Sequence, residues 1–116
     1  MAKIRNMGLH ERTAILGGII VPKSAMMLKY MDSSVAGVSV PKSLIDRMNK
    51  AKAAAGEDKK KARELQEQEG IKITIELIHQ VLETPGVKGV HIQAIEWESA
   101  IEGIVKAAGL YPRPTV

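Results

Sequence analysis

The stretch GVHIQAIEWE, residues 89–98, holds the side chains best suited to chemistry in this sequence of 116 residues. His91, Gln93 and Ile95 occupy alternate positions of a segment that reads as a β-strand, so they share one face of it. Trp97 follows between two glutamates. An imidazole can bind ligands or move protons, an amide forms hydrogen bonds, and an indole stacks on flat rings. We therefore treat this stretch as a candidate ligand-binding site.

Other reaction chemistries have little support in the sequence. None of His10, His79 and His91 has a second His, Asp or Glu at a metal-ligand spacing that forms a convincing site, so we expect no metal. Cysteine is absent, which excludes disulfides and thiolate sites. No Ser-His-Asp set can be named, so no catalytic residue is assigned. We expect His79 to be a hydrogen-bonded packing residue, and a neighbouring strand could satisfy His91 in the same way.

The charge pattern favours no nucleic-acid partner. The net charge is +4, but the lysine run at 59–61 lies in a window, residues 57–69, that holds four basic and five acidic side chains. The three aromatic residues are too scattered to stack bases. The longest apolar run is far shorter than the roughly 20 residues that cross a bilayer. We expect a soluble, cytoplasmic protein, and the lack of cysteine fits that compartment.

The first half of the chain predicts a strand followed by helices. Residues 13–20, TAILGGII, are typical of a strand buried on both faces of a parallel sheet. Its glycine pair lacks the spacing of a phosphate-binding loop and indicates close approach of a backbone or ligand. Ser24 can cap the helix that follows. Pro41 suits the first position of a second helix, which Gly56 ends.

The second half predicts one long helix, a strand and a final helix. The long helix runs over residues 57–84, and Gly70 inside it should weaken it by roughly 1 kcal/mol relative to alanine. Its apolar side is formed by Leu65, Ile71, Ile75, Ile78 and Leu82. After a turn at 84–86 come a strand over 87–95 and a helix over 98–108, capped by Gly109.

This order of elements predicts an α/β fold in one domain, residues 1–116. Two strands joined through helices should be parallel neighbours. A pair of parallel strands has two open edges and is marginally stable in water, so further strands are expected to complete the sheet. In a sheet closed into a barrel, His91 and the two alternating residues after it would face the interior. Val90, Ile92 and Ala94 would lie under helices.

Several segments together resemble the methylenetetrahydrofolate reductase family. They are GGIIVPKSAMMLKYM, a short VSVP before a helix, GIKITIELIHQVLETPGVKGVHIQAIEWE and the terminal AAGLYPRP. The likeness covers nearly the whole chain but about the final third of a family member. It implies a partial TIM (βα)8 barrel, in which residues 13–20 form the seventh strand, residues 87–95 the eighth, and MAKIRNMGL the end of the preceding helix.

The resemblance also implies a cofactor and a set of contacts. Family members bind FAD at the carboxyl-terminal mouth of the barrel and reduce methylenetetrahydrofolate. The positions that correspond to their flavin and folate contacts are Met27 and Met31 in the first helix and Gln93, Ile95 and Trp97 around the last strand. The catalytic glutamate of the family, and most contacts to the ribityl and phosphate groups, lie on strands that this chain does not contain.

Two functions follow as expectations. The first is the C-terminal part of a flavin-dependent methylenetetrahydrofolate reductase, inactive alone and completed by a missing N-terminal barrel chain, with FAD and a folate bound in the completed barrel. The alternative is a small non-enzymatic α/β module that uses its strand edges for self-association or for docking on a protein partner. In either case we expect the isolated chain to form homo-oligomers.

Overall fold

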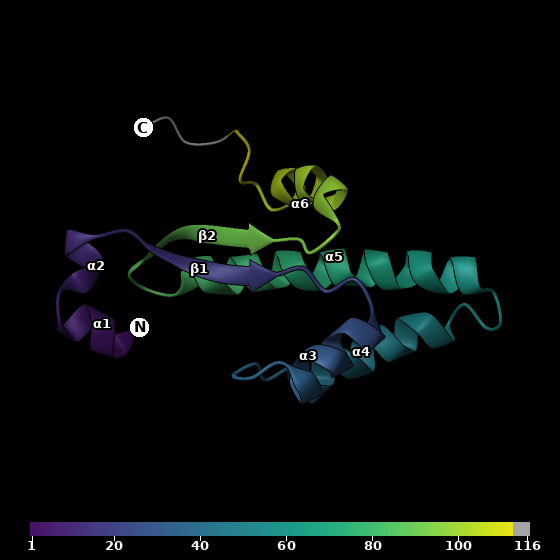
Figure 1. Cartoon of the computed structure of the whole chain (residues 1–116). Coiled ribbons are helices and arrows are strands. Elements are labelled where there is room, and N and C mark those ends of the chain that lie inside the picture. Colours follow the sequence, from purple (N-terminus) through teal and green to yellow (C-terminus); the bar gives the residue numbers. More distant parts are fainter. Residues whose placement is uncertain (113–116) are drawn as a thin grey trace. The chain divides into compact units, whose positions relative to one another are not determined.

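A computed structural model describes residues 1–112 of the chain (Figure 1). It is a mixed α/β structure with two strands and several helices. In chain order the elements are α1 (Ala2–Asn6), α2 (Leu9–Arg12), β1 (Ile15–Ile20), α3 (Ala25–Ser34), α4 (Lys42–Ala53), α5 (Lys59–Glu83), β2 (Val87–Gln93), the 3₁₀ turn η1 (Glu98–Ala100) and α6 (Ile101–Ala107). Within residues 1–112, no helix combines the length and the apolar character needed to span a membrane.

The described chain divides into two compact units. The first consists of Met1–Ile20 and the described residues from Thr74 onward, and the second is Val21–Ile73. The boundary falls inside α5, which is one continuous helix, as the sequence predicted. Each unit has its own buried core.

The first unit is built on the two strands, which pair in parallel as predicted. Gly18 lies opposite His91, and Ile19 lies opposite Ile92. One face of this sheet is covered by helices, because Ile19 is 4% exposed, and Ile78 of α5 and Ile104 of α6 are fully buried.

Close approach of α5 explains the first glycine of the strand. A Cβ at Gly17 would overlap Cγ1 of Val81 in α5, so only glycine fits there without a shift. The glycine pair predicted close approach of a backbone or ligand, whereas the group that approaches Gly17 is the side chain of Val81. Figure 1 shows the carboxyl-terminal part of α5 running along the sheet and α6 lying beside β2.

The other face of the sheet is open in the described structure. Leu16 is 56% exposed, and Gly18, His91 and Gln93 are exposed as well. The prediction that the first strand is buried on both faces is therefore wrong for residues 1–112. Helices of the unit cover one face only, and a strand of a two-stranded sheet then alternates between buried and exposed positions.

The amino-terminal segment forms two short helices, not the end of one. Gly8 separates α1 from α2 with φ +68°, a left-handed conformation that breaks a helix and that glycine adopts readily. Arg5 Nη1 donates a hydrogen bond of 2.9 Å to the carbonyl of Pro85, in the turn before β2. This contact joins the start of the chain to the predicted turn at 84–86.

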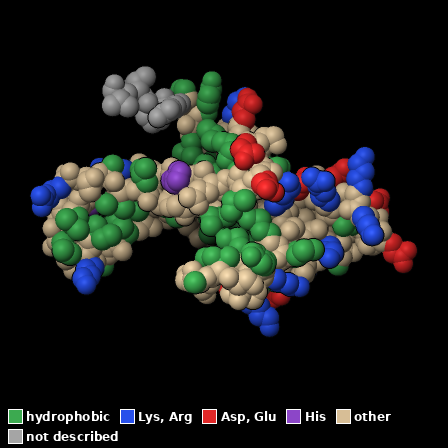
Figure 2. All heavy atoms as spheres, viewed as in Figure 1, with side chains coloured by type: hydrophobic (Ala, Val, Ile, Leu, Met, Phe, Trp, Pro, Cys, Tyr) green, Lys and Arg blue, Asp and Glu red, His purple; other side chains and the backbone are tan. Residues whose placement is uncertain are grey.

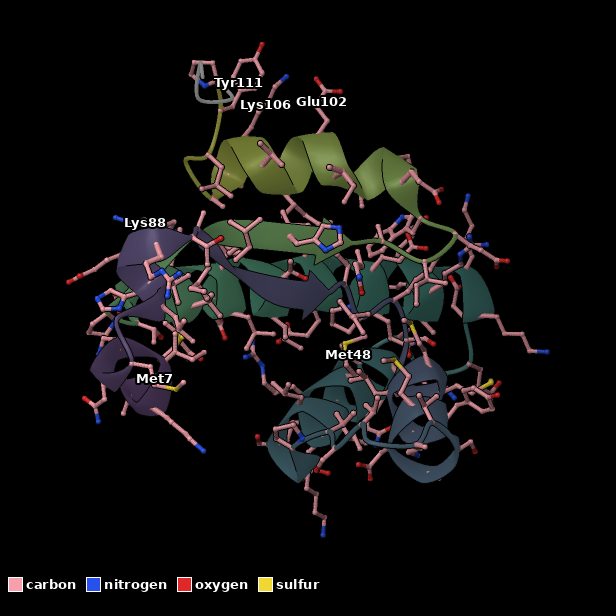
Figure 3. The ribbon with its side chains drawn as sticks, turned by 60° about the vertical axis from the view of Figure 1, so that its left-hand side comes forward. Met7, Met48, Lys88, Glu102, Lys106 and Tyr111 are labelled. Carbon is pink, nitrogen blue, oxygen red and sulfur yellow. The ribbon has the colours of Figure 1, made fainter. Side chains whose placement is uncertain are left out.

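The second unit packs α3, α4 and the first part of α5 around a small core. Met48 of α4, labelled in Figure 3, and Ile73 of α5 are fully buried, and Leu28 of α3 is 7% exposed. Both Nε and Nη2 of Arg47 approach Oε1 of Glu69, at 2.8 and 2.7 Å, which ties α4 to α5. Helix α4 begins one residue later than predicted, with Pro41 as its N-cap.

The buried side of α5 differs from the predicted apolar stripe. Of the five predicted residues, Ile78 is fully buried, whereas Leu65, Ile71, Ile75 and Leu82 are half-buried. The buried positions are Gln66, Gly70, Ile73, Thr74 and Ile78. The stripe was misplaced because three of these residues are polar or glycine, and an apolar period of 3.6 cannot register them.

Candidate ligand-binding site at the carboxyl end of the sheet

The carboxyl ends of the two strands lie side by side at one end of the sheet. Gln93 is the last residue of β2, and it lies opposite Ile20, the last residue of β1. The Gln93 side chain is exposed on the open face. An amide presents both a donor and an acceptor, so Gln93 can bind the polar edge of a ligand placed at this end of the sheet.

The loop after β2 brings two further predicted residues to the same end. Ile95 is 57% exposed, and Trp97 is half-buried. Between them Glu96 has φ +53°, a left-handed conformation that is uncommon for a residue with a side chain and costs of order 1 kcal/mol. This conformation turns the chain sharply from β2 into η1. Gln93, Ile95 and Trp97 thus combine one amide with two apolar surfaces within five residues.

His91 lies deeper along the open face, away from the loop. Its neighbour across the strand pair is Gly18, and a Cβ built there would meet nothing within 4 Å. The imidazole therefore stands on an exposed face beside open space. The close approach of a backbone or ligand that the glycine pair predicts is not found at Gly18 among residues 1–112, where the face is open.

Two predicted contact residues belong to the second unit. Met27 and Met31 lie on α3 one helical turn apart, and both are half-buried. Ser24 caps this helix as predicted, because its Oγ accepts a hydrogen bond of 3.1 Å from the N–H of Met27.

His79 lies on α5 and contacts α6. Its Nε2 is 3.4 Å from the carbonyl oxygen of Ala108, at the end of α6. The prediction of a hydrogen-bonded histidine is confirmed, although the side chain is exposed and not part of a packed stripe. His79 therefore belongs to the helix contacts of the first unit and not to the candidate site.

A groove of about 560 Å³ follows the free edge of β2 near its amino end. It is lined by three successive residues of β2, which are Lys88, Gly89 and Val90. Successive side chains point to opposite faces of a sheet, so a groove that reaches all three residues runs along the edge of the strand. The remaining lining residues come from β1, α5 and the segment after α6: Leu16, Leu82, Gly109, Leu110 and Pro112. This groove was not predicted from the sequence.

Charged side chains elsewhere form mixed surfaces. Figure 2 shows Lys and Arg side chains interspersed with Asp and Glu over the amino-terminal part of α5 and its surroundings. Arg63 Nε contacts Oε1 of Glu67 at 3.0 Å, one turn along the helix. Asp58 Oδ1 accepts hydrogen bonds of 3.0 and 3.1 Å from the N–H groups of Lys60 and Lys61, which caps α5. The lysine run is thus the first turn of a helix with balanced charge.

The described residues offer binding groups rather than a reacting set. Within residues 1–112, no three His, Asp or Glu side chains gather in a way that could hold a metal ion. The carboxyl end of the sheet carries an amide, an aliphatic and an indole side chain, which can bind and orient a flat, partly polar molecule.

Comparison with known proteins identifies the family of this chain. A family model described as methylenetetrahydrofolate reductase matches residues 1–109. Searches of the curated proteins and of the solved structures gave no match. The family match covers both strands, all the helices and the loop with Ile95 and Trp97.

Proposed function

Because the chain belongs to the methylenetetrahydrofolate reductase family, we propose that it supplies the last two βα units of a flavin-dependent (βα)8 barrel that reduces a folate-bound one-carbon group. The observation that carries this proposal is the open face of the β1–β2 sheet. Helices cover the outer face, as in a barrel, while Gly18, His91 and Gln93 stand exposed on the face that a barrel encloses. Residues 1–116 would then act as one domain within the barrel.

The strand edges support the same proposal. Among residues 1–112 the sheet has two strands, so each strand has one edge without a strand partner, and barrels remove such edges by pairing every strand on both sides. The groove along β2 provides space beside one of these edges. Further strands, in the same polypeptide or in a second chain, would pair there and on the far side of β1.

The residues at the carboxyl end of the sheet fit the ring system of FAD better than its phosphates. Gln93 and Ile95 are exposed, and Gly18 leaves open space on the same face. The loop after β2 carries Glu96 and Glu98 and no Lys or Arg, and these carboxylates would repel a pyrophosphate. The phosphate groups would therefore be held by the added strands.

In the completed barrel, FAD would supply hydride transfer, and the protein would supply binding and orientation. The amide of Gln93 would hydrogen-bond the polar edge of a ring. Ile95 and Trp97 would cover apolar ring surface and exclude water. Met27 and Met31, adaptable side chains on α3, would add further apolar contact to flavin or folate.

Flavin retention tests the proposed function. We expect residues 1–116 alone to hold no FAD, and the same residues joined to or co-expressed with the first six βα units of a family member to purify as a yellow protein. The reason is that one quarter of a barrel lacks the groups that bind the phosphates. The measurement is the absorption spectrum near 450 nm after gel filtration in the presence of FAD.

A variant with Gln93→Ala and Trp97→Ala serves as the control. Gln93 is the last residue of β2, and Trp97 lies in the loop after it. Neither belongs to the buried core, so the assembly should still form while its flavin content drops. A colourless assembly of wild-type residues 1–116 with the added strands would contradict the proposal.

A second candidate function rests on the same free edges. A module that self-associates would bury the β2 groove and the open face against another copy of the chain. This reading needs no cofactor, and it predicts the same behaviour of the isolated chain as the barrel proposal.

The isolated chain of residues 1–116 is therefore expected to self-associate. Unpaired strand edges and exposed apolar side chains such as Leu16 gain free energy when they are covered. Light scattering coupled to gel filtration should give a mass of at least twice 12.6 kDa. A stable colourless oligomer that persists when the six further βα units are present would favour the module over the reductase. A monodisperse species of 12.6 kDa would refute the prediction.

A further inference from the structure

Gln66 is a buried polar residue that connects α5 to the start of α3. It is 8% exposed, within the unit Val21–Ile73. Its Oε1 accepts a hydrogen bond of 3.0 Å from the N–H of Ala25, 41 residues away. Its Nε2 donates a bond of 3.1 Å to the carbonyl of Ala62, one turn back on α5. The donor at Ala25 and the acceptor at Ala62 fix which end of the amide faces which partner.

The bond to Ala25 acts at the first residue of α3. The first N–H groups of a helix have no partner within the helix. Ser24 Oγ satisfies the N–H of Met27, and Gln66 satisfies the N–H of Ala25, which is 3% exposed. One cap is local in sequence, and the other reaches across from a different helix. The position of the α3 terminus therefore depends on α5.

Gly70, one turn after Gln66, holds the segment that leads into α3. A Cβ at Gly70 would overlap the carbonyl oxygen of Pro22, so this glycine allows the backbone of the β1–α3 segment to lie directly against α5. Val21 and Pro22 are buried. Two positions on one side of α5 thus contact the segment at Pro22 and at Ala25, before the helix that carries Met27 and Met31.

We propose that Gln66 is a positioning residue for ligand binding, which sets the start of α3 and thereby the orientation of Met27 and Met31. The proposal rests on the proposed function, because it assumes that these methionines face flavin or folate. Gln66 itself contacts no ligand in this scheme. Its effect is transmitted through the backbone of Ala25 and the first turn of α3.

The test compares Gln66→Met with Arg47→Gln. Methionine keeps the volume and length of glutamine but removes both hydrogen bonds. Arg47→Gln breaks the contact with Glu69, which also belongs to α5, and removes neither hydrogen bond of Gln66. Both variants weaken contacts within the same unit, and only the first removes the side-chain acceptor of the Ala25 N–H.

Two measurements separate positioning from general support. Amide hydrogen exchange on residues 1–116 should show faster exchange at Ala25 and through the first turn of α3 in Gln66→Met, but not in Arg47→Gln. In the assembly with six further βα units, FAD affinity should fall roughly three- to tenfold in Gln66→Met. A change of this size is expected for the loss of the buried hydrogen bond to the N–H of Ala25. The visible circular dichroism of the bound flavin should change in that variant only.

The outcomes distinguish this inference from the proposed function. Equal loss of FAD affinity in the two variants, or unchanged exchange at Ala25, would overturn the positioning role. A wild-type assembly that binds no FAD would overturn the proposed function, and with it the role of Gln66 in ligand binding. Even then, faster exchange at Ala25 would show that the contact between α5 and α3 exists as described.

Discussion

Replacing Gly70 by alanine is expected to destabilise the second unit by about 1–3 kcal/mol, although alanine is the better helix former. The added Cβ would overlap the carbonyl oxygen of Pro22, and that oxygen belongs to a backbone segment in which Val21 is 2% exposed. A buried backbone cannot move aside as a flexible side chain does, so strain outweighs the roughly 1 kcal/mol gain in helix propensity. Urea unfolding followed by circular dichroism at 222 nm measures the difference.

Gly103→Ala is the matched control for this prediction. Gly103 lies inside α6, is exposed, and has nothing within 4 Å of an added Cβ. Alanine at this position should stabilise the protein by about 0.5–1 kcal/mol, because only helix propensity changes. Opposite signs for the two substitutions are the expected result. Stabilisation by both would mean that Pro22 does not approach α5 as the structure shows.

The same helix illustrates what the sequence could and could not predict. The existence and continuity of α5 were predictable, because a long helical pattern tolerates one glycine. Its buried side was not, because that side includes Gln66 and Thr74, whose burial depends on partners elsewhere in the chain. Gly70 was recognised as a cost to the helix, whereas its benefit, the approach of Pro22, is a contact 48 residues away in sequence.

The alternation of faces in β2 was predicted correctly, whereas the burial of β1 was not. Alternation in β2 placed His91 and Gln93 on the face opposite Val90 and Ile92, and the structure confirms this. The continuous apolar run of β1 was interpreted as burial on both faces. A run of apolar residues does not show whether both faces of its strand are covered, because burial of a face depends on which other elements pack against it.

The candidate site was predicted in part for a similar reason. Gln93, Ile95 and Trp97 follow one another within a strand end and its loop, so local pattern was enough to group them. The left-handed conformation of Glu96 was not foreseen, because no glycine or asparagine marks it. Gly18 and the groove along β2 emerge only when the register between distant strands is known.

The neighbouring glycines of β1 give the sharpest test of the barrel. Gly18→Leu should not destabilise isolated residues 1–116 and should stabilise them by up to about 1 kcal/mol, because its Cβ meets nothing within 4 Å and glycine weakens a strand interior. In the completed barrel, however, the same leucine would point into an interior already filled by side chains. Overpacking of about 1–3 kcal/mol would lower assembly with the six further βα units by roughly five- to 150-fold. Titration of one chain with the other, followed by flavin absorption, measures this loss.

Gly17→Leu is the matched control, one residue away on the opposite face. Its Cβ would overlap Val81 of α5, so the isolated chain itself should lose about 1–3 kcal/mol of stability. Gly17→Leu should therefore destabilise the isolated chain, whereas Gly18→Leu should impair only the assembly with the six further βα units. If Gly18→Leu assembled and bound flavin as well as the wild type, the open face of the sheet would not be the inside of a barrel. The exposed His91 and Gln93 would then have to be explained as part of a surface that solvent or a different partner covers.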